Sequence, residues 1–432
     1  MYRGISSEEM VIAMGRGGFL AFFGAGGLGL QRVDAAISTL KEASRGEFAY
    51  GVNFVHQPDR PEAEEALVDL LLGRGVHIVE ASAFLHMSPA LVRYRAKGLK
   101  RRPDGSLSIE NRVFGKVSRP EVAQCFLSPA PARIVKHLLA TRSLSEEEAR
   151  LIEAVPIADA LTVEGDSGGH TDKGLLLALL PAIAAMRDTL KATHRYGQNV
   201  YIGAAGGIGA PGAVAAAFAL GADYVLTGSV NQCTVESGAS VAVKDLLQAA
   251  DIQDVAMAPA GDLLEIGSRV QVLRRGTLFA ARANKLYELY QRCDSLGDID
   301  RRTRAHVEEK ILKASFDYVF QEVEAHYASS GHAELERARL DPKYKMLLVF
   351  KWYFARSTRL AEEGNVANQA DYQVHCSPAI GAFNALVKGT ELEPWRNRRV
   401  SHIGTLLMEG AARHLGERFA DWPLGALSAR AS

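Results

Sequence analysis

Cysteine is scarce in this chain, and its distribution excludes two structural classes. The four cysteines among 432 residues are Cys125, Cys233, Cys293 and Cys376, and no two of them have C-x-x-C spacing. This arrangement argues against a zinc ribbon, which needs paired thiol ligands, and against a dense disulfide framework. We expect reduced thiols in a cytoplasmic protein.

An excess of charge of either sign is also missing. Lys plus Arg and Asp plus Glu both number 50, so the formal net charge is zero. Without a net field the chain has no long-range attraction for nucleic acid or for an anionic membrane. The most apolar N-terminal stretch, residues 10–30, is a poor membrane span because Arg16 and seven glycines interrupt it. It also lacks a secretory cleavage pattern, so we predict neither a membrane nor a nucleic-acid partner.

What the chain has instead is a regular alternation of short apolar runs and helical stretches, which is typical of a parallel βα protein. Helical patterns at residues 62–72, 146–154, 175–189 and 212–220 lie between the runs. Several of the runs lead into Gly, Asn or Ser, which commonly begin a βα loop. We predict seven strands, at residues 19–23, 48–54, 76–81, 112–117, 159–163, 199–204 and 223–226.

Glycine-rich turns at the ends of the last two predicted strands favour a (β/α)8 barrel over an open doubly wound sheet. Residues 205–209 read Ala-Gly-Gly-Ile-Gly, and residues 227–229 read Thr-Gly-Ser. Adjacent late loops that present backbone N–H groups to one phosphate are the usual phosphate site of such barrels. The alternative is an ordinary pair of βα turns. The predicted phosphate-binding residues are Ala205, Gly206, Gly207, Ile208, Thr227, Gly228 and Ser229.

Counting backwards from these turns leaves the barrel one strand short. If the last two predicted strands are strands 7 and 8, residues 19–23 form strand 2, and only a loop and a helix at residues 6–14 precede them. We expect either that a strand precedes Met1 in the natural product or that another segment closes the barrel. The strand-like residues 270–273 are the candidate for such a segment.

The character of the sequence changes at about residue 287, where it becomes charged, aromatic and helical. We therefore predict a barrel over residues 1–285 and a helical substrate-binding or lid subdomain over residues 286–432, covering the barrel mouth. No repeat period is present in this part. Its predicted helices are residues 301–328, 332–339, 345–360, 378–387 and 400–419.

The loop after the predicted strand 159–163 carries the candidate catalytic residue. Residues 164–172 read Glu-Gly-Asp-Ser-Gly-Gly-His-Thr-Asp. Gly168 and Gly169 allow the loop to pass close to a planar cofactor, and His170 titrates near neutrality, so it can donate or accept a proton. The alternative is that His170 caps a helix that begins near Asp172.

Further candidates lie at the ends of earlier strands. Asn53 is expected to hydrogen-bond a flavin ring, and Lys116 to offset negative charge at the edge of that ring. The alternative for both is a loop residue that faces solvent. The run Gly24, Ala25, Gly26 departs from the Rossmann pattern, and we expect its backbone to pack against a flat ring. We assign structural roles, and no metal site, to three histidines without partners at ligand spacing, His56, His86 and His137.

The combination of residues 164–170, 205–209 and 227–229 resembles the 2-nitropropane dioxygenase-like flavoproteins, which include nitronate monooxygenases and a class of bacterial enoyl reductases. That superfamily typically reads E-G-x-E-A-G-G-H, whereas Asp166 and Ser167 precede the glycines here. The variant resembles the trans-acting enoyl reductases of polyketide and polyunsaturated fatty acid synthases. Further similar stretches are residues 1–5, 22–27, 231–236, 258–262, 270–273, 282–287 and 345–350.

The resemblance implies FMN as cofactor, NADPH as electron source and a 2-enoyl thioester on an acyl carrier protein as substrate. It further implies hydride delivery to the β-carbon, with His170 nearest the α-carbon proton or the developing enolate charge. Family members have a strand ending in Gly-Ala-Met before the equivalent of Tyr2-Arg3-Gly4, so the comparison also indicates that strand 1 is absent. Polyketide or fatty acid synthase modules are the expected partners, and a homodimer is a further expectation.

Two other functions are alternatives that fit the sequence. A nitronate monooxygenase uses the same flavin site with a small substrate and has no need of a helical lid. A docking or scaffold subunit would keep the fold but lose the flavin, because its barrel is incomplete.

Overall fold

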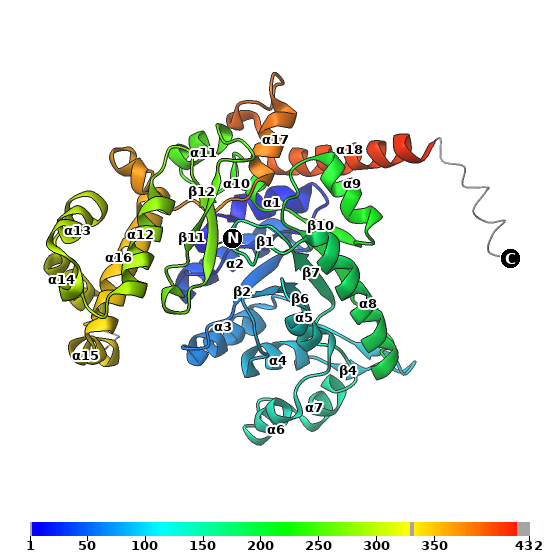
Figure 1. Cartoon of the computed structure of the whole chain (residues 1–432). Helices are drawn as coiled ribbons and strands as arrows, with labels where there is room; N and C mark the ends of the chain where they lie inside the picture. The colour runs from blue at the N-terminus through cyan, green and yellow to red at the C-terminus, as the bar shows by residue number, and fades with distance from the viewer. Residues whose placement is uncertain (1, 329–331, 421–432) are drawn as a thin grey trace. The chain divides into compact units, whose positions relative to one another are not determined.

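The computed structural model describes residues 2–328 and 332–420 and divides into two compact units (Figure 1). The first unit comprises the described residues up to Asp166, residues 172–238 and the described residues from Leu386 onward. The second comprises Ser167–Thr171 and Ala239–Ala385. This division differs from the predicted boundary at residue 285, because residues 239–285 share a hydrophobic core with the helices that follow them. Each unit is described by itself.

The first unit is built on a seven-stranded parallel sheet with the order β1-β2-β3-β6-β7-β9-β10. All seven predicted strands are confirmed, and the α/β fold is a TIM-like half-barrel. In Figure 1, α3, α4, α5 and α8 lie along the outside of these strands. The strands are β1 (Phe22–Phe23), β2 (Gly51–Val55), β3 (Ile78–Ser82), β6 (Arg112–Val117), β7 (Ala160–Glu164), β9 (Tyr201–Ala205) and β10 (Tyr224–Leu226).

Helices connect successive strands, as parallel pairing requires. Several of them begin at proline. Proline fits the first helical position because an N–H group there would have no acceptor within the helix. A short hairpin of β4 (Lys100–Arg101) and β5 (Leu107–Ser108) precedes β6. The helices are α1 (Glu8–Arg16), α2 (Leu30–Ser44), α3 (Pro61–Arg74), α4 (Pro89–Ala96), α5 (Pro120–Leu127), α6 (Ala132–Ala140), α7 (Glu146–Ile152), α8 (Leu176–His194), α9 (Pro211–Ala219), α10 (Ser229–Gln232) and α18 (Val400–Ala420).

Aromatic rings fill the inside of the curled sheet. The ring of Phe114 on β6 lies 5.4 Å from that of Phe22 on β1 and 6.0 Å from that of Tyr224 on β10. A methyl group on Gly51 would lie 2.5 Å from the Phe22 ring, and one on Gly203 would collide with the Tyr224 ring. Glycine inside a strand marks such a close approach. We call Phe22, Phe114 and Tyr224 the aromatic layer.

Among the described residues, β1 and β10 are the two edges of the sheet. Backbone hydrogen bonds of residues 3–5 connect the segment that follows β1 with the segment that follows β10. The N–H groups of Arg3 and Gly4 donate to the carbonyls of Gly26 and Gly24, both at 2.8 Å. The carbonyl of Ile5 accepts from Gly238 N–H at 2.9 Å. The helix α18 packs against both α1 and α9, which flank these edges.

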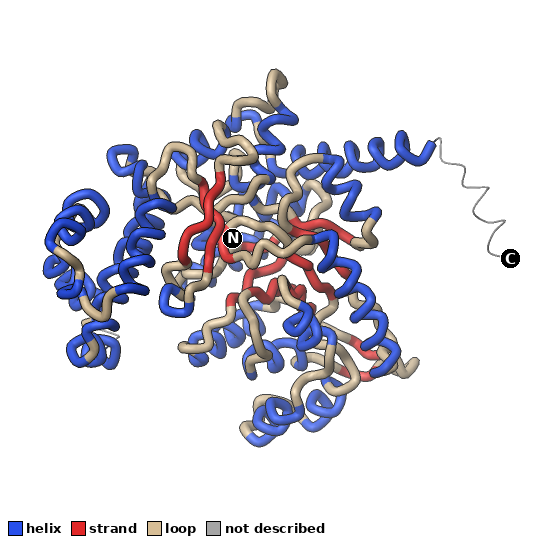
Figure 2. The backbone as a smooth tube through the Cα atoms, viewed as in Figure 1, coloured by secondary structure: helices blue, strands red, loops and turns tan. Residues whose placement is uncertain are grey.

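The candidate closing segment is not part of this sheet. Residues 270–273 do form a strand, β12 (Arg269–Leu273), but it pairs antiparallel with β11 (Val255–Pro259) and with β8 (Gly169–His170). These three strands form the sheet of the second unit, whose two long strands are red in Figure 2. The expectation that residues 270–273 close the barrel is therefore wrong.

The rest of the second unit is helical, as predicted for the C-terminal part of the chain. Phe279 and Tyr353 stack with ring centroids 5.9 Å apart, and Phe316 meets Phe350 at 6.4 Å. The predicted helix 301–328 is interrupted at Lys313, where the backbone has a positive φ of 57°. The helices are α11 (Val241–Gln248), α12 (Phe279–Arg292), α13 (Arg301–His306), η4 (Val307–Leu312), α14 (Phe316–Tyr327), α15 (His332–Leu340), α16 (Pro342–Glu363) and α17 (Ala379–Val387), which ends in the first unit.

One buried carboxylate connects several of these helices. Asp371 is fully buried and accepts hydrogen bonds from Arg282 on α12 and from the hydroxyl of Tyr353 on α16, the latter at 2.9 Å. Lys313 lies 3.0 Å from its other oxygen, and Arg356 lies 3.9 Å away. Opposite charges offset the cost of burying the carboxylate.

No helix in the described part of the chain combines the length and apolarity that a membrane span needs. No disulfide links the four cysteines. Within the same residues, no three His, Cys, Asp or Glu side chains gather closely enough to hold a metal ion.

The Asp371 cluster leads to a stability prediction. Asp371→Asn leaves the half-buried Arg282 and Arg356 and the exposed Lys313 without their counter-charge, and breaking a buried ion pair costs about 3–5 kcal/mol. We expect a corresponding fall in the urea midpoint of unfolding, followed by circular dichroism. The control is Asp317→Asn, because Asp317 is 80% exposed and its ion pair with Arg304 is long, at 3.9 Å. Loss of this surface charge should change the free energy of unfolding by at most about 0.5 kcal/mol. Equal effects of the two substitutions would contradict this assignment.

Candidate functional site

The two predicted glycine turns lie side by side in the first unit. β9 and β10 pair in parallel with Ala205 opposite Leu226, so the turns that follow leave the sheet at adjacent points. Gly206 and Gly207 have positive φ values of 88° and 70°. A Cβ on Gly206 would lie 2.9 Å from the carbonyl carbon of Gly165, so only glycine fits there.

The backbone of the first turn has free donors. Among the described residues, no acceptor is found for the N–H groups of Gly206, Gly207 and Ile208. The turn leads into α9, whose N-terminus carries a partial positive charge. In the second turn, Asn231 Nδ2 donates to the Thr227 carbonyl at 3.0 Å and so fixes the backbone before Gly228 and Ser229. Together the turns have the features of an anion site.

The Gly24–Gly26 loop also lies at the carboxyl edge of the sheet, directly after β1. All three of its residues are buried. The carbonyls of Gly24 and Gly26 accept hydrogen bonds from the N-terminal segment, and Gly24 N–H donates to the Ser6 carbonyl at 2.9 Å. The loop therefore has a fixed backbone, with its polar groups largely paired within the first unit.

A cluster of polar side chains lies on the inner face of the sheet. It consists of Asn53, Glu80, Lys116 and Glu164, from four adjacent strands, and we call it the polar layer. Lys116 Nζ lies 3.4 Å from Glu164 Oε1. Asn53 Nδ2 lies 3.0 Å from Glu80 Oε2 and 2.9 Å from Ser82 Oγ. Asn53 and Lys116 therefore do not face solvent from loops, which excludes the alternative interpretation.

The charges in the polar layer influence one another. Burial alone would lower the pKa of Lys116, but the carboxylates of Glu164 and Glu80 outweigh burial and raise it. Burial raises the pKa of Glu80, although Lys116 opposes this effect. The layer therefore maintains a protonated lysine beside two acids, one of which is fully buried.

The loop with the candidate catalytic histidine belongs to the second unit. Gly169 and His170 form β8 against β12, and α8 begins only at Leu176, so His170 does not cap a helix. A Cβ on Gly168 would lie 2.7 Å from the backbone of Cys376, and Gly169 has a positive φ of 82°. Both glycines are therefore required by close packing in this unit.

His170 pairs with a carboxylate that the sequence analysis did not identify. His170 Nε2 lies 3.0 Å from Asp262 Oδ1, and the side chains are 48% and 64% exposed. Burial would raise the pKa of Asp262, but the hydrogen bond and charge of His170 outweigh it and lower that pKa. The carboxylate fixes the orientation of the imidazole ring.

A second histidine missed from the sequence lies beside this pair. His375 Nε2 is 2.7 Å from Gln373 Nε2, and Thr358 Oγ1 donates to Gln373 Oε1 at 3.3 Å. Burial and the neighbouring His170 lower the pKa of His375 to about 4. His375 is therefore neutral, with Nε2 as the acceptor. It follows an irregular segment in a region predicted as helical, so no periodicity or motif indicated it.

The predicted residues thus fall into two groups. The first unit holds twelve of them at the carboxyl edge or inner face of one sheet: Gly24, Ala25, Gly26, Asn53, Lys116, Ala205, Gly206, Gly207, Ile208, Thr227, Gly228 and Ser229. The second unit holds Gly168, Gly169 and His170. His56, assigned a structural role, pairs with Glu64 at 2.6 Å and stacks on Phe84.

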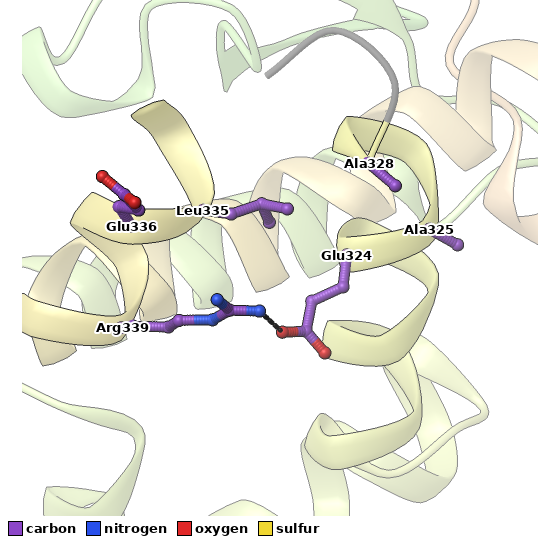
Figure 3. A pocket seen from close by; sticks show the side chains of 6 residues that line it. All are labelled: Glu324, Ala325, Ala328, Leu335, Glu336 and Arg339. Atoms are coloured by element: carbon purple, nitrogen blue, oxygen red, sulfur yellow. Dashed lines mark hydrogen bonds and ion pairs between the residues drawn. The ribbon is translucent and has the colours of Figure 1, made fainter. Parts of the chain in front are cut away.

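A pocket elsewhere in the second unit contains none of the predicted residues. Glu324, Ala325 and Ala328 line it from α14 and its C-terminal end, and Leu335, Glu336 and Arg339 from α15 (Figure 3). Arg339 pairs with Glu324 at 3.2 Å, and the arginine is 63% exposed. An exposed ion pair of this kind contributes little stability and suggests no chemistry.

Two family models match parts of the chain. The nitronate monooxygenase model matches residues 115–271, which include the end of β6, all of β7, the His170 loop and both glycine turns. The model for the inserted helical domain of [acyl-carrier-protein] S-malonyltransferase matches residues 293–372, within the helical part of the second unit.

Longer similarities extend over nearly the whole chain. The polyketide biosynthesis protein PksE of Bacillus subtilis is 51% identical over 97% of this chain and 54% of its own length. A polyunsaturated fatty acid synthase polypeptide from Thraustochytrium is 43% identical over 91% of this chain and 26% of its own length. The chain thus spans about half of PksE and about a quarter of the Thraustochytrium polypeptide.

Solved structures agree with these similarities. The enoyl reductase domain of MlnA, from the macrolactin cluster of Bacillus amyloliquefaciens, is 42% identical, with a TM-score of 0.94 over 97% of this chain and 94% of that domain. FabK of Thermotoga maritima shares the fold at 17% identity, with a TM-score of 0.57 over 97% of this chain and 94% of FabK. The chain therefore belongs to the trans-acting enoyl reductase family of polyketide and polyunsaturated fatty acid synthases, within the nitronate monooxygenase-like superfamily.

Proposed function

We propose that this chain reduces the 2,3 double bond of an enoyl thioester carried on an acyl carrier protein, with FMN as cofactor and NADPH as electron donor. The observation that carries the proposal is the pair of adjacent glycine turns, in which the N–H groups of Gly206, Gly207 and Ile208 have no acceptor among the described residues. Membership of an enoyl reductase family supports the thioester as substrate class.

The turns fit the phosphate group of FMN. A phosphate at this edge would accept hydrogen bonds from the first turn and from the backbone of Thr227, Gly228 and Ser229, while the N-terminus of α9 adds a favourable dipole. A Cβ on Gly207 or Gly228 would meet no atom within 4 Å, so both turns leave room for a ligand. The Gly24–Gly26 backbone, in the same unit as the two turns, is the proposed contact for the flat ring.

Asn53 and Lys116 are the proposed polar contacts of that ring. Lys116 remains protonated between Glu164 and Glu80, so it can stabilise negative charge that develops beside it. When bound, FMN supplies the hydride that the β-carbon of the thioester accepts. The protein then has to supply a proton and stabilise enolate charge on the thioester oxygen.

His170 is the proposed group for this second task. Asp262 fixes its ring, so that the imidazole can hold the proton that the α-carbon receives. His375 remains neutral next to it and does not compete for the same charge. Since His375 is neutral, His170 is the proposed proton donor of this pair.

The partners proposed for the reaction follow from the relatives. PksE and the Thraustochytrium polypeptide are named for polyketide biosynthesis and for polyunsaturated fatty acid synthesis, both of which extend acyl chains on carrier proteins. We propose that this chain acts in such a synthase and accepts carrier-bound enoyl groups.

The phosphate site can be tested with a pair of matched glycine variants. Gly207 and Gly46 both have positive φ and no atom within 4 Å of an added Cβ, so alanine brings the same strain of about 1 kcal/mol to each. We expect Gly207→Ala to weaken FMN binding about tenfold or more, because the turn shifts and loses N–H contacts worth about 1.4 kcal/mol. Gly46→Ala should bind FMN like the wild type. Fluorescence titration of the apoprotein measures both, and equal affinities would contradict the site.

The role of His170 can be tested by turnover under anaerobic conditions with NADPH and a crotonyl thioester. Loss of a general acid typically slows a reaction about 100-fold or more, so we expect His170→Ala to lower kcat by that factor while FMN content is unchanged. His137→Ala, at an exposed helical position, is the control and should leave kcat unaltered. Unchanged turnover in the His170 variant would remove this residue from the mechanism.

The same assay distinguishes enoyl reduction from the alternative nitronate monooxygenase activity. The nitronate monooxygenase model matches the residues that hold Lys116, the His170 loop and both glycine turns, so this activity is the alternative to be tested. Oxygen-dependent nitronate consumption without any anaerobic thioester reduction would overturn the enoyl reductase proposal.

A further inference from the structure

Glu80 is a buried acid to which the proposed function gives no role. It lies in the middle of β3, its exposure is 0%, and no hydrogen-bond partner is found for its Oε1 atom among the described residues. A buried carboxyl with an unsatisfied oxygen is unfavourable compared with an apolar side chain of similar size. Stability therefore does not explain an acid at this position.

Glu80 determines the orientation of the Asn53 amide. Asn53 Nδ2 lies within hydrogen-bond distance of three acceptors: the Glu80 carbonyl at 3.2 Å, Glu80 Oε2 at 3.0 Å and Ser82 Oγ at 2.9 Å. With the amide reversed, its oxygen would face a carbonyl and a carboxyl oxygen, which repel it. The network thus orients Nδ2 of Asn53 toward Glu80 and Ser82 on β3. The amide oxygen Oδ1 is then the atom that can accept a hydrogen bond from a ligand.

Glu80 also acts on Lys116. Glu164 lies 3.4 Å from the Lys116 ammonium, and Glu80 contributes a second negative charge from the neighbouring strand β3. The two acids differ in surroundings, because Glu164 is 17% exposed at the end of β7 whereas Glu80 is fully enclosed. Charges in an enclosed site act more strongly on one another than charges in water.

We propose that Glu80 is the positioning residue of the flavin site: it holds Asn53 with the amide oxygen toward the ring and provides a buried counter-charge for Lys116. This inference rests on the proposed function, since it concerns the two residues assigned there to the ring. The acceptor at Asn53 suits an N–H group of the flavin, and the lysine suits an electron-rich edge. Glu80 would thereby influence how readily the bound flavin accepts electrons.

The first test measures the midpoint potential of bound FMN. Glu80→Gln keeps the shape and an acceptor for Asn53 but removes the negative charge, so we expect a higher midpoint potential. Ser82→Ala is the matched control, because it removes one contact of Asn53 without changing charge, and its potential should equal that of the wild type. An unaltered potential in Glu80→Gln, with normal FMN content, would overturn the inference.

A second test stays informative if Glu80→Gln does not fold. Asn53→Asp places an acid opposite Glu80 and removes the donor, so we expect FMN affinity to fall at least tenfold. Combining both substitutions restores a donor and an acceptor with their positions exchanged, and it should recover most of that affinity. Wild-type affinity in Asn53→Asp would overturn the inference. Failure of the wild-type protein to bind FMN would instead overturn the proposed function itself.

Discussion

The parallel pairing of seven strands is the constraint on which the candidate site depends. Because every strand runs in the same direction, all the carboxyl ends meet at one edge, and residues from distant parts of the sequence lie together there. Strand geometry also sets which face a side chain occupies. Lys116 follows Phe114 by two residues on β6, so both side chains lie on the same face, with the lysine nearer the carboxyl end of the strand.

Much of this unit could be predicted from local signals. Buried parallel strands are continuous apolar runs, and each run here is separated from the next by a helical pattern, so all seven strands were recognisable. Gly206 and Gly207 need positive φ, which is a backbone requirement that the sequence expresses directly as glycine. Asn53 and Lys116 were recognisable because polar residues near strand ends are exceptions to apolar runs.

The remainder depends on contacts between distant segments. Glu80 also interrupts an apolar run, but its role depends on the pairing of β2 with β3, which brings it to Asn53 and which no local pattern indicates. Asp262 reaches His170 only because β8, a two-residue strand, pairs with β12 about a hundred positions later. The same pairing explains why a boundary at residue 285 is not where the structure divides: residues 239–285 form the sheet on which the later helices pack.

The β8 pairing has a consequence for any attempt to dissect the protein. The second unit is discontinuous, since five of its residues, Ser167–Thr171, come from between β7 and α8 of the first. A fragment of residues 239–385 would lack β8 and would leave the inner edge of β12 with unpaired N–H and carbonyl groups, which favours aggregation. The histidine loop belongs to the second unit but is joined at both ends to the first. Neither unit can therefore be excised as one continuous segment of the chain.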